Sequence, residues 1–491
     1  MIIRVDLKRA VSPFCWEALR RLPLADAVLS LWAYVMRPAF LQTVFQKHRG
    51  RSFEDVLSFP VIVELMSDAL LQHQGSGRQA CLRADEEGLL PTCLEAFYGK
   101  LRRLPLSLSI GFLEETTQRL RALRPAAARS DEQPASLRDL TLIMVDGKAL
   151  KNVAKRLLVS RGRSGKLLGG RLLVAYVPAE GVVPSFAAHE DGETNEARLI
   201  PDLIPRVRQV ITGTRLWILD RQFCDLTQPR VLVEDGDHFL IRYHSKTSFQ
   251  ADPSRPATAS RDAQGRTVCD EWGWLGSPTS KHRRYVRRVH LLRPGEEEVI
   301  LVSDLLEADQ YPATDLLAAY LQRWSIESVF QQVTEVFELR HFIGSTPQAT
   351  IFQAAFCFLL FNLLQVIREH LAAAQSTPCR VEDLSLEGLL TDVTRQLIAV
   401  LEFVSPEELC RMIPESRSDQ ELLGHLRRIL AVPISKLWKK TKNKNRRPHL
   451  KKKQRQSGAH TSVARLIDPA KNPPAKRRST KKRHATNLTT K

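Results

Sequence analysis

The sequence predicts an α/β fold in which a strand-rich central region lies between two helical regions. Apolar, β-rich runs follow one another from Leu137 to about residue 311, whereas the flanking segments carry apolar residues near helical spacing. The chain has 491 residues, enough for two to four domains, and 43% of them are apolar, which is enough to build real cores. We therefore expect a strand-rich domain in the middle of the chain.

Residues 1–123 predict a helical N-terminal domain. The runs VLSLWAYVMRPAF, FPVIVELMSDALL and LPTCLEAFYGKL have near-helical apolar spacing and are separated by Pro and Gly. This domain is a candidate for binding DNA ends, although no sharp helix-turn-helix signature is present. Residues 124–136 are small, polar and proline-containing, so they predict a linker.

The central region, residues 137–340, opens with three strands, a helix and a fourth strand. The strands are TLIMVD, the two halves of GGRLLVAYVPAEGVVPSFAAH, and RLWILD, and Asn195 can cap the helix. This order matches the opening of a ribonuclease-H-like domain. Asp146 and Asp220 end the first and fourth strands, where open α/β sheets place their sites.

A β-rich insertion is expected at about 236–311, because four further runs there read as strands. It contains Trp272 and Trp274, which suit stacking on a DNA base, or are instead half-buried strand residues. It also contains a basic cluster that could contact the DNA backbone. The alternative is a solvated edge strand, where Lys and Arg discourage pairing with another strand. The cluster consists of Lys281, Arg283, Arg284, Arg287 and Arg288.

Residues 312–339 predict one long helix, because Pro312 opens 27 residues without Gly or Pro. Tyr320, Arg323, Glu327 and Thr334 lie on or near one stripe of this helix. Trp324 and Phe330 flank the Glu327 carboxylate, which therefore needs a partner or a cation. A local ion pair with Arg323 is the simpler alternative.

Residues 341–435 predict a helical C-terminal region that is a candidate for dimerisation. Its run from Ile351 to Ile367 is interrupted by Gln353, Asn362 and Gln365, so we expect a buried helix and not a membrane span. Residues 436–491 predict a disordered basic tail, since they hold 20 Lys and Arg against one acid, whereas residues 1–435 carry 53 of each sign. Such a tail holds polyanions without reading sequence.

The eight cysteines form no CxxC pair, so we do not expect a zinc site. The same pattern predicts reduced cysteines and a cytoplasmic protein. The order Asp146, Asp220 and Glu327, with strands inserted before the glutamate and Tyr-x2-Arg-x3-Glu around it, resembles the DDE transposases of bacterial insertion sequences. More narrowly it is similar to the insertion-sequence-four family. Two positions depart from that family's pattern: Thr334 stands where a lysine is expected, and Gln222 where a glycine is common.

The resemblance implies that Asp146, Asp220 and Glu327 are catalytic and hold two Mg²⁺ ions, for which Mn²⁺ substitutes. Without metal, such clustered acids should have raised pKa values. The implied DNA-binding residues are Tyr320, Arg323, Trp272, Trp274, Arg284 and Arg287. The implied partners are double-stranded DNA, as terminal repeats and as target, and a second copy of the chain in a synaptic homodimer. The implied location is the bacterial cytoplasm, on the nucleoid.

Three alternatives to an active transposase stay open from the sequence. The first is a catalytically impaired descendant that binds element ends, which Thr334 and Gln222 motivate. The second is a ribonuclease-H-like nuclease without strand transfer. The third is a nucleic-acid-binding scaffold held by the tail, in which the acids are only structural.

Overall fold

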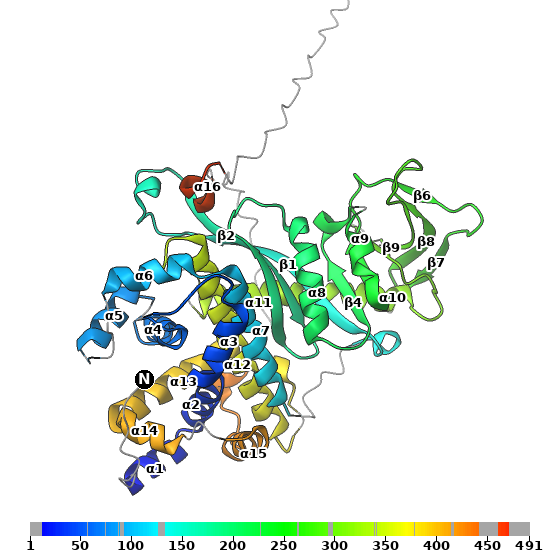
Figure 1. The fold of residues 1–491 in the computed structure, drawn as a ribbon. Coiled ribbons are helices and arrows are strands. Elements are labelled where there is room, and N and C mark those ends of the chain that lie inside the picture. Colours follow the sequence, from blue (N-terminus) through cyan, green and yellow to red (C-terminus); the bar gives the residue numbers. More distant parts are fainter. Residues whose placement is uncertain are drawn as a thin grey trace, which may run out of the picture.

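The fold is known from a computed structural model. It describes residues 12–55, 57–73, 75–86, 88, 93–125, 133–225, 227–262, 265–292, 298–337, 339, 341–377, 379–413, 417–440 and 460–470. A sheet crosses the molecule, and helices from both ends of the chain gather on one side of it (Figure 1). The protein is therefore a mixed α/β structure with a central sheet, as predicted.

The N-terminal region is helical, as its apolar spacing predicts. Pro13, Pro23 and Pro38 stand in the first turns of α1, α2 and α3, where a fixed φ favours the helix and a missing N–H costs no hydrogen bond. The helices are α1 (Pro13–Arg20), α2 (Pro23–Val35), α3 (Pro38–His48), α4 (Phe59–Leu71), α5 (Gly77–Glu86), α6 (Leu94–Arg103) and α7 (Leu106–Ala122).

The central region contains the strands and helix that the sequence predicts, in the predicted order. Asn195 caps the short turn before the helix by accepting a hydrogen bond from the Ala197 amide. The elements are β1 (Thr141–Lys151), β2 (Lys166–Val177), β3 (Val182–His189), α8 (Ile200–Val210), β4 (Arg215–Leu219), α9 (Gln228–Leu232), β5 (His238–Arg242), β6 (Phe249–Ala251), β7 (Thr258–Arg261), β8 (Thr267–Leu275), β9 (Arg284–Leu291) and β10 (Val299–Ser303).

These strands and β11 (His460–Ser462) belong to one sheet of order β11-β2-β1-β4-β5-β10-β9-β8-β6, with β3 beside β2 and β7 beside β8. Strands β1, β4 and β5 are parallel to one another, whereas β2 pairs antiparallel with β1 and β10 pairs antiparallel with β5. The predicted insertion begins at about residue 236, but β5 pairs with β4 and so belongs to the central sheet. Strands β6 to β9 extend that sheet beyond β10.

Alternate residues of the central strands face two different cores. On β1, Leu142 and Met144 pack in the large core with α7 and α12 (Pro347–Ala373), whereas Ile143 and Val145 pack in a second core with α8. Strands buried on both faces read as continuous apolar runs, which is why TLIMV shows no polar alternation. The side that a residue faces is therefore set by its place in this alternation.

Helices of the second half of the chain complete the large core. Helix α12 is long and apolar enough to cross a membrane, yet its most apolar window is entirely buried inside the protein. Asn362 hydrogen bonds to both backbone groups of Val183, and Gln353 to the backbone of His341 and Ile343. Internal partners of this kind identify α12 as a core helix. The helices are α10 (Ala313–Leu321), α11 (Trp324–Glu335), α12 (Pro347–Ala373), α13 (Leu386–Phe403), α14 (Pro406–Met412) and α15 (Asp419–Ile429).

The predicted tail is partly folded. Residues 441–459 and 471–491 lie outside the described residues, but β11 (His460–Ser462) pairs in parallel with the start of β2, and α16 (Val463–Ile467) follows it. Arg465 forms ion pairs with Asp191 and Glu193 in the loop after β3. The prediction that residues 436–491 are disordered is therefore wrong for this segment, because an edge of β2 is open to another strand.

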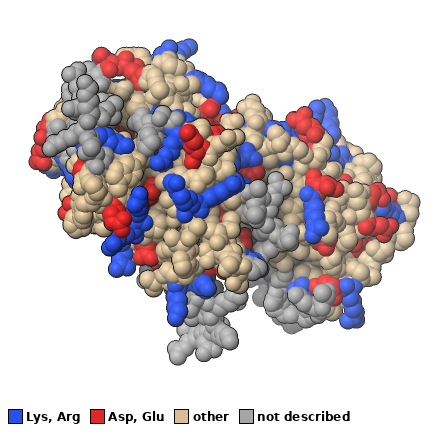
Figure 2. Space-filling view, turned by 90° about the horizontal axis from the view of Figure 1, so that it is seen from below, with Lys and Arg blue, Asp and Glu red and all other residues tan. Residues whose placement is uncertain are grey.

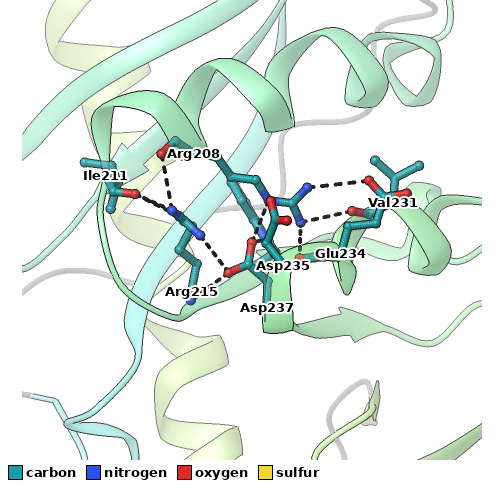
Figure 3. Close-up of polar contacts among 8 residues, drawn as sticks. Arg208, Ile211, Arg215, Val231, Glu234, Asp235 and Asp237 are labelled. Carbon is teal, nitrogen blue, oxygen red and sulfur yellow. Dashed lines mark hydrogen bonds and ion pairs between the residues drawn. The ribbon is translucent and has the colours of Figure 1, made fainter.

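A buried carboxylate holds the other end of the parallel strands. Asp237, just before β5, accepts hydrogen bonds from the Arg215 amide at 3.0 Å, the Arg215 guanidinium at 2.9 Å and the Trp217 indole at 3.0 Å. Arg208 donates to its second oxygen at 2.9 Å (Figure 3). Because every oxygen is engaged by protein donors, Asp237 is a structural acid.

Candidate active site

Asp146 and Asp220 lie next to each other on neighbouring strands. The prediction that Asp146 ends the first strand is wrong, because β1 continues to Lys151 through its pairing with β2, whereas Asp220 does follow the last residue of β4. In the parallel register Val145 faces Leu219, and the two aspartates follow these residues. Asp146 continues the series of Leu142 and Met144 toward the large core. Asp220 has extended backbone angles, φ −80° and ψ 170°, and so continues the alternation of β4 toward the same side. Strand pairing thus brings together two carboxylates that are 74 positions apart in the sequence.

The third acid lies on α11. The expected single helix from 312 to 339 is wrong, because α10 ends at Leu321 and α11 begins at Trp324. At the junction the Arg323 amide bonds to the Tyr320 carbonyl, and the Ile326 amide to the Arg323 carbonyl. These i to i+3 bonds form a tighter 3-10 turn, although Gln322 and Arg323 both keep helical backbone angles. A Gly or Pro signal is absent, so the sequence did not reveal this break.

Arg323 joins the acids. Its Nη1 donates to Asp146 Oδ2 at 3.3 Å, and its Nη2 donates to Glu327 Oε1 at 3.1 Å. Tyr320, one turn earlier, donates its hydroxyl to Asp220 Oδ1 at 3.3 Å. The Arg323 side chain is only 5% exposed, whereas that of Glu327 is 41% exposed. The three predicted acids therefore converge around one buried guanidinium, with Glu327 open to solvent.

Burial and charge shift the pKa values of this group. Burial raises the pKa of Asp146 to about 6, while the Gly147 amide and Arg323 lower it and two glutamates raise it further. The raised carboxylate pKa was predicted from mutual repulsion, but burial is the larger cause here. Burial, and next the charge of Asp220, raise the pKa of Tyr320 to about 12. Burial alone would lower the pKa of Arg323, but Tyr320 and the two aspartates raise it.

The donor set suits a hard divalent cation, because carboxylate oxygens are the ligands that Mg²⁺ and Mn²⁺ prefer. In the described residues no group of three or more His, Cys, Asp or Glu side chains is already arranged around a metal position. The Arg323 guanidinium instead takes the place of a cation among the acids, and its Nε atom is buried with no hydrogen-bond partner in the part of the chain that the structure describes. The oxygen donors of these residues therefore suit a divalent ion, provided that the Arg323 guanidinium moves away from the carboxylates.

Residues 139–363, which hold all three acids, match the family model described as "Transposase DDE domain". This part of the chain is similar to transposase DDE domains. The chain is 22% identical over 205 residues to "Putative transposase y4zB" of Sinorhizobium fredii, a match that covers 41% of this chain. The chain spans about half the length of that relative, 54%. The narrower assignment to the insertion-sequence-four family stays a prediction.

One solved structure is similar to this chain over most of the length of both chains. It is the piggyBac transposase synaptic complex with hairpin DNA, with a TM-score of 0.39 and 12% identity. The similarity covers 84% of this chain and 90% of the other.

Two polar groups near Asp146 were not predicted as site residues. Glu196 accepts hydrogen bonds from Arg171 and from Gln222. Gln222, which stands where the insertion-sequence-four pattern often has a glycine, therefore positions the Glu196 carboxylate. A Cβ at Gly147 would lie 1.8 Å from the Glu196 carboxyl carbon, so this carboxylate packs against the backbone next to Asp146. A pairing of Gly147 with a glutamate 49 positions later leaves no periodic signal in the sequence.

Lys148 is the second unpredicted residue. Its Nζ lies 2.8 Å from Thr334 Oγ1 and 3.3 Å from the Phe330 carbonyl oxygen. Burial lowers the pKa of Lys148 to about 8. The position where the family pattern has a lysine, Thr334, is thus in contact with a lysine from β1.

The predicted DNA-contact residues of β8 and β9 divide into exposed and buried ones. Trp274 is 39% exposed and lies beneath the Arg283 guanidinium, whereas Trp272 is only 4% exposed and donates its indole N–H to the Leu306 carbonyl at 2.9 Å. Arg287 is fully buried and paired with Asp270 at 2.7 Å. The prediction that Arg287 and Trp272 contact DNA is therefore corrected, because their polar groups bind the protein. Trp274 and Arg284 stay candidates.

Proposed function

We propose that this protein is a DNA transposase that binds the terminal inverted repeats of its own insertion sequence, cleaves DNA at the element ends and joins them to target DNA. One observation carries the proposal. Asp146, Asp220 and Glu327, taken from two strands and a helix, converge around Arg323 within the region that is similar to transposase DDE domains. A ribonuclease-H-like domain with a β-rich insertion, here strands β6 to β9, is the architecture that we propose for it.

The three carboxylates hold the metal in this proposal. Asp146, Asp220 and Glu327 would hold two Mg²⁺ ions, or Mn²⁺ in their place, which would supply Lewis acidity for phosphoryl transfer. Arg323 offsets the charge of Asp146 and Glu327, and Tyr320 donates a hydrogen bond to Asp220. With metal ions on the carboxylates, Arg323 and Tyr320 would contact backbone phosphate. Arg323 suits both tasks, because its planar fork pairs with carboxylates and phosphates alike.

The partners follow from the same proposal. Double-stranded DNA is bound as element end and as target, and a homodimer brings two ends together. On the face seen in Figure 2, Lys and Arg are interspersed with Asp and Glu. The excess of basic residues after Lys436 is therefore the proposed source of nonspecific, salt-sensitive affinity for DNA. The proposed location is the bacterial cytoplasm, on the nucleoid.

The experiment is cleavage of a duplex that carries the terminal repeats of the element encoding this chain, with Mg²⁺ or with chelator. Wild type is compared with Glu327→Gln, which keeps the size of the side chain but removes its charge. Glu335→Gln is the matched control, because Glu335 lies on the same helix and bonds only to Gln331 among the described residues. We expect metal-dependent nicking at the repeat boundary in wild type and control, and end binding without nicking in Glu327→Gln.

The other outcomes separate the alternatives. End binding without nicking by wild type would indicate an impaired descendant that binds ends. Nicking without joining to a target plasmid would indicate a nuclease of the same fold. Unchanged nicking by Glu327→Gln would remove Glu327 from the site.

A further inference from the structure

Two contacts tie β1 to α11, one on each side of Glu327. Asp146 meets Arg323 just before the helix, and Lys148 meets Phe330 and Thr334 farther along it. Lys148 lies two residues after Asp146 on the strand, so both side chains leave β1 on the same side. The Lys148 ammonium is therefore on the acid side of the sheet.

The Lys148 ammonium has no acid partner among the described residues. Its contacts are the Thr334 hydroxyl, the Phe330 carbonyl and, 5.0 Å away, the face of the Phe330 ring. The charged side chain that acts on it is another cation, Lys151. The two acceptors take two of its three N–H groups. A partly buried cation without a counter-charge is costly, so this position is complete only when an anion arrives.

Thr334 cannot take that role itself. Its hydroxyl donates to the Phe330 carbonyl at 2.6 Å and accepts from Lys148, so it has no hydrogen left for a phosphate oxygen. It carries no charge and serves to hold the ammonium.

We propose that Lys148 binds a backbone phosphate of the DNA strand being cut, supplying from β1 the cation that position 334 of α11 lacks. This inference rests on the proposed function, since it names the substrate group that Lys148 receives. A lysine is a compact point charge with three donors, and it can keep its two protein acceptors while the third N–H meets a phosphate oxygen. The same arrangement orients Lys148 through Thr334 before DNA binds.

The test moves the charge. Lys148→Gln removes it, and the double variant Lys148→Gln with Thr334→Lys returns it from the helix. Lys151→Gln is the matched control, because Lys151 lies on the same strand and is exposed. Terminal-repeat duplex is the probe in two measurements: the single-turnover nicking rate with Mg²⁺, and binding in Ca²⁺ as a function of salt.

Lys148→Gln is expected to slow nicking by about 10- to 100-fold, the effect of one lost charge-assisted bond. The slope of log affinity against log salt should become shallower by about 1, as for one lost phosphate contact. The double variant should recover most of both, and Lys151→Gln should change neither.

A salt slope and nicking rate that stay at wild-type values in Lys148→Gln would overturn the inference. A lowered melting temperature in Lys148→Gln with no recovery of binding in the double variant would also overturn it. In that case Lys148 would only stabilise the packing of β1 against α11. Absence of nicking in the wild type would contradict the proposed function instead. The salt slope in Ca²⁺ would then still decide whether Lys148 meets phosphate.

Discussion

Arg323 Nη1 lies 3.3 Å from Asp146 Oδ2, so the strand that carries the first acid is joined to the turn that precedes the last one. The same guanidinium reaches Glu327 at 3.1 Å. A single arginine therefore neutralises acids that would otherwise repel one another. It also competes with any cation for the same oxygens.

We expect Arg323→Gln to lower the melting temperature in chelator by several degrees, because the acids lose their counter-charge. Added Mg²⁺ should then raise the melting temperature more in this variant than in wild type, since the ion no longer competes with the guanidinium. The measurement is a thermal melt with and without Mg²⁺. Arg288→Gln, which breaks a pair with Glu271 on β8 and β9, is the control and should leave the Mg²⁺ effect unchanged. An equal Mg²⁺ effect in all three proteins would contradict the competition.

Asp146→Asn should stabilise the metal-free protein at pH 7.5 while abolishing the proposed cleavage of terminal-repeat DNA. The pKa of Asp146 is raised to about 6 in the folded protein, so the folded state holds a proton that the unfolded chain releases. The free energy of unfolding of wild type therefore falls as pH rises from about 4 to 6. The shift corresponds to roughly 2–3 kcal/mol above pH 6. Asparagine avoids this cost, and its advantage should vanish near pH 4.

Urea unfolding in chelator at pH 4, 6 and 7.5 checks this prediction. If Asp146→Asn is less stable than wild type at pH 7.5, then the Arg323 pair outweighs burial and the assigned cause is wrong.

Asp237 should behave in the opposite way. Asp237→Asn removes a charge that Arg208 and Arg215 both need, so we expect about 3–5 kcal/mol of destabilisation, the range for a broken buried pair. Asp235→Asn is the matched control, because Asp235 is exposed and pairs with Arg208 at 3.4 Å. Asparagine also tolerates its positive φ of 61°. Urea unfolding at pH 7.5 should separate the two by several kcal/mol, and similar values would disprove the structural role of Asp237.

Two truncations test the docking of β11 and α16. A chain ending at Ala470 keeps both elements and should melt like the full chain. A chain ending at residue 459 loses the pairing with β2 and the Arg465 ion pairs, so we expect its melting temperature to fall by a few degrees. Hydrogen exchange at Leu167 and Leu168 should accelerate only in the shorter chain. Equal exchange in both truncations would show that the segment does not pair with β2.

Local pattern was sufficient for much of the fold. The strands of the central region, their order, the helix after β3 and the buried helix α12 are all confirmed, because apolar periodicity and capping residues act over a few positions. The position of Asp220 was also predictable, since it follows a buried strand, whereas Asp146 lies within β1, which pairing with β2 extends to Lys151.

Tertiary structure decided the rest. The burial of Arg287 and Trp272, the addition of β11 to β2 and the contact between Lys148 and Thr334 join residues far apart in the chain. No periodic pattern encodes such pairs, because each depends on how whole elements pack. The sequence by itself determined which residues are candidates for the chemistry. Packing decided which of them meet, because only the assembled sheet and the broken α10–α11 helix place one guanidinium among three carboxylates.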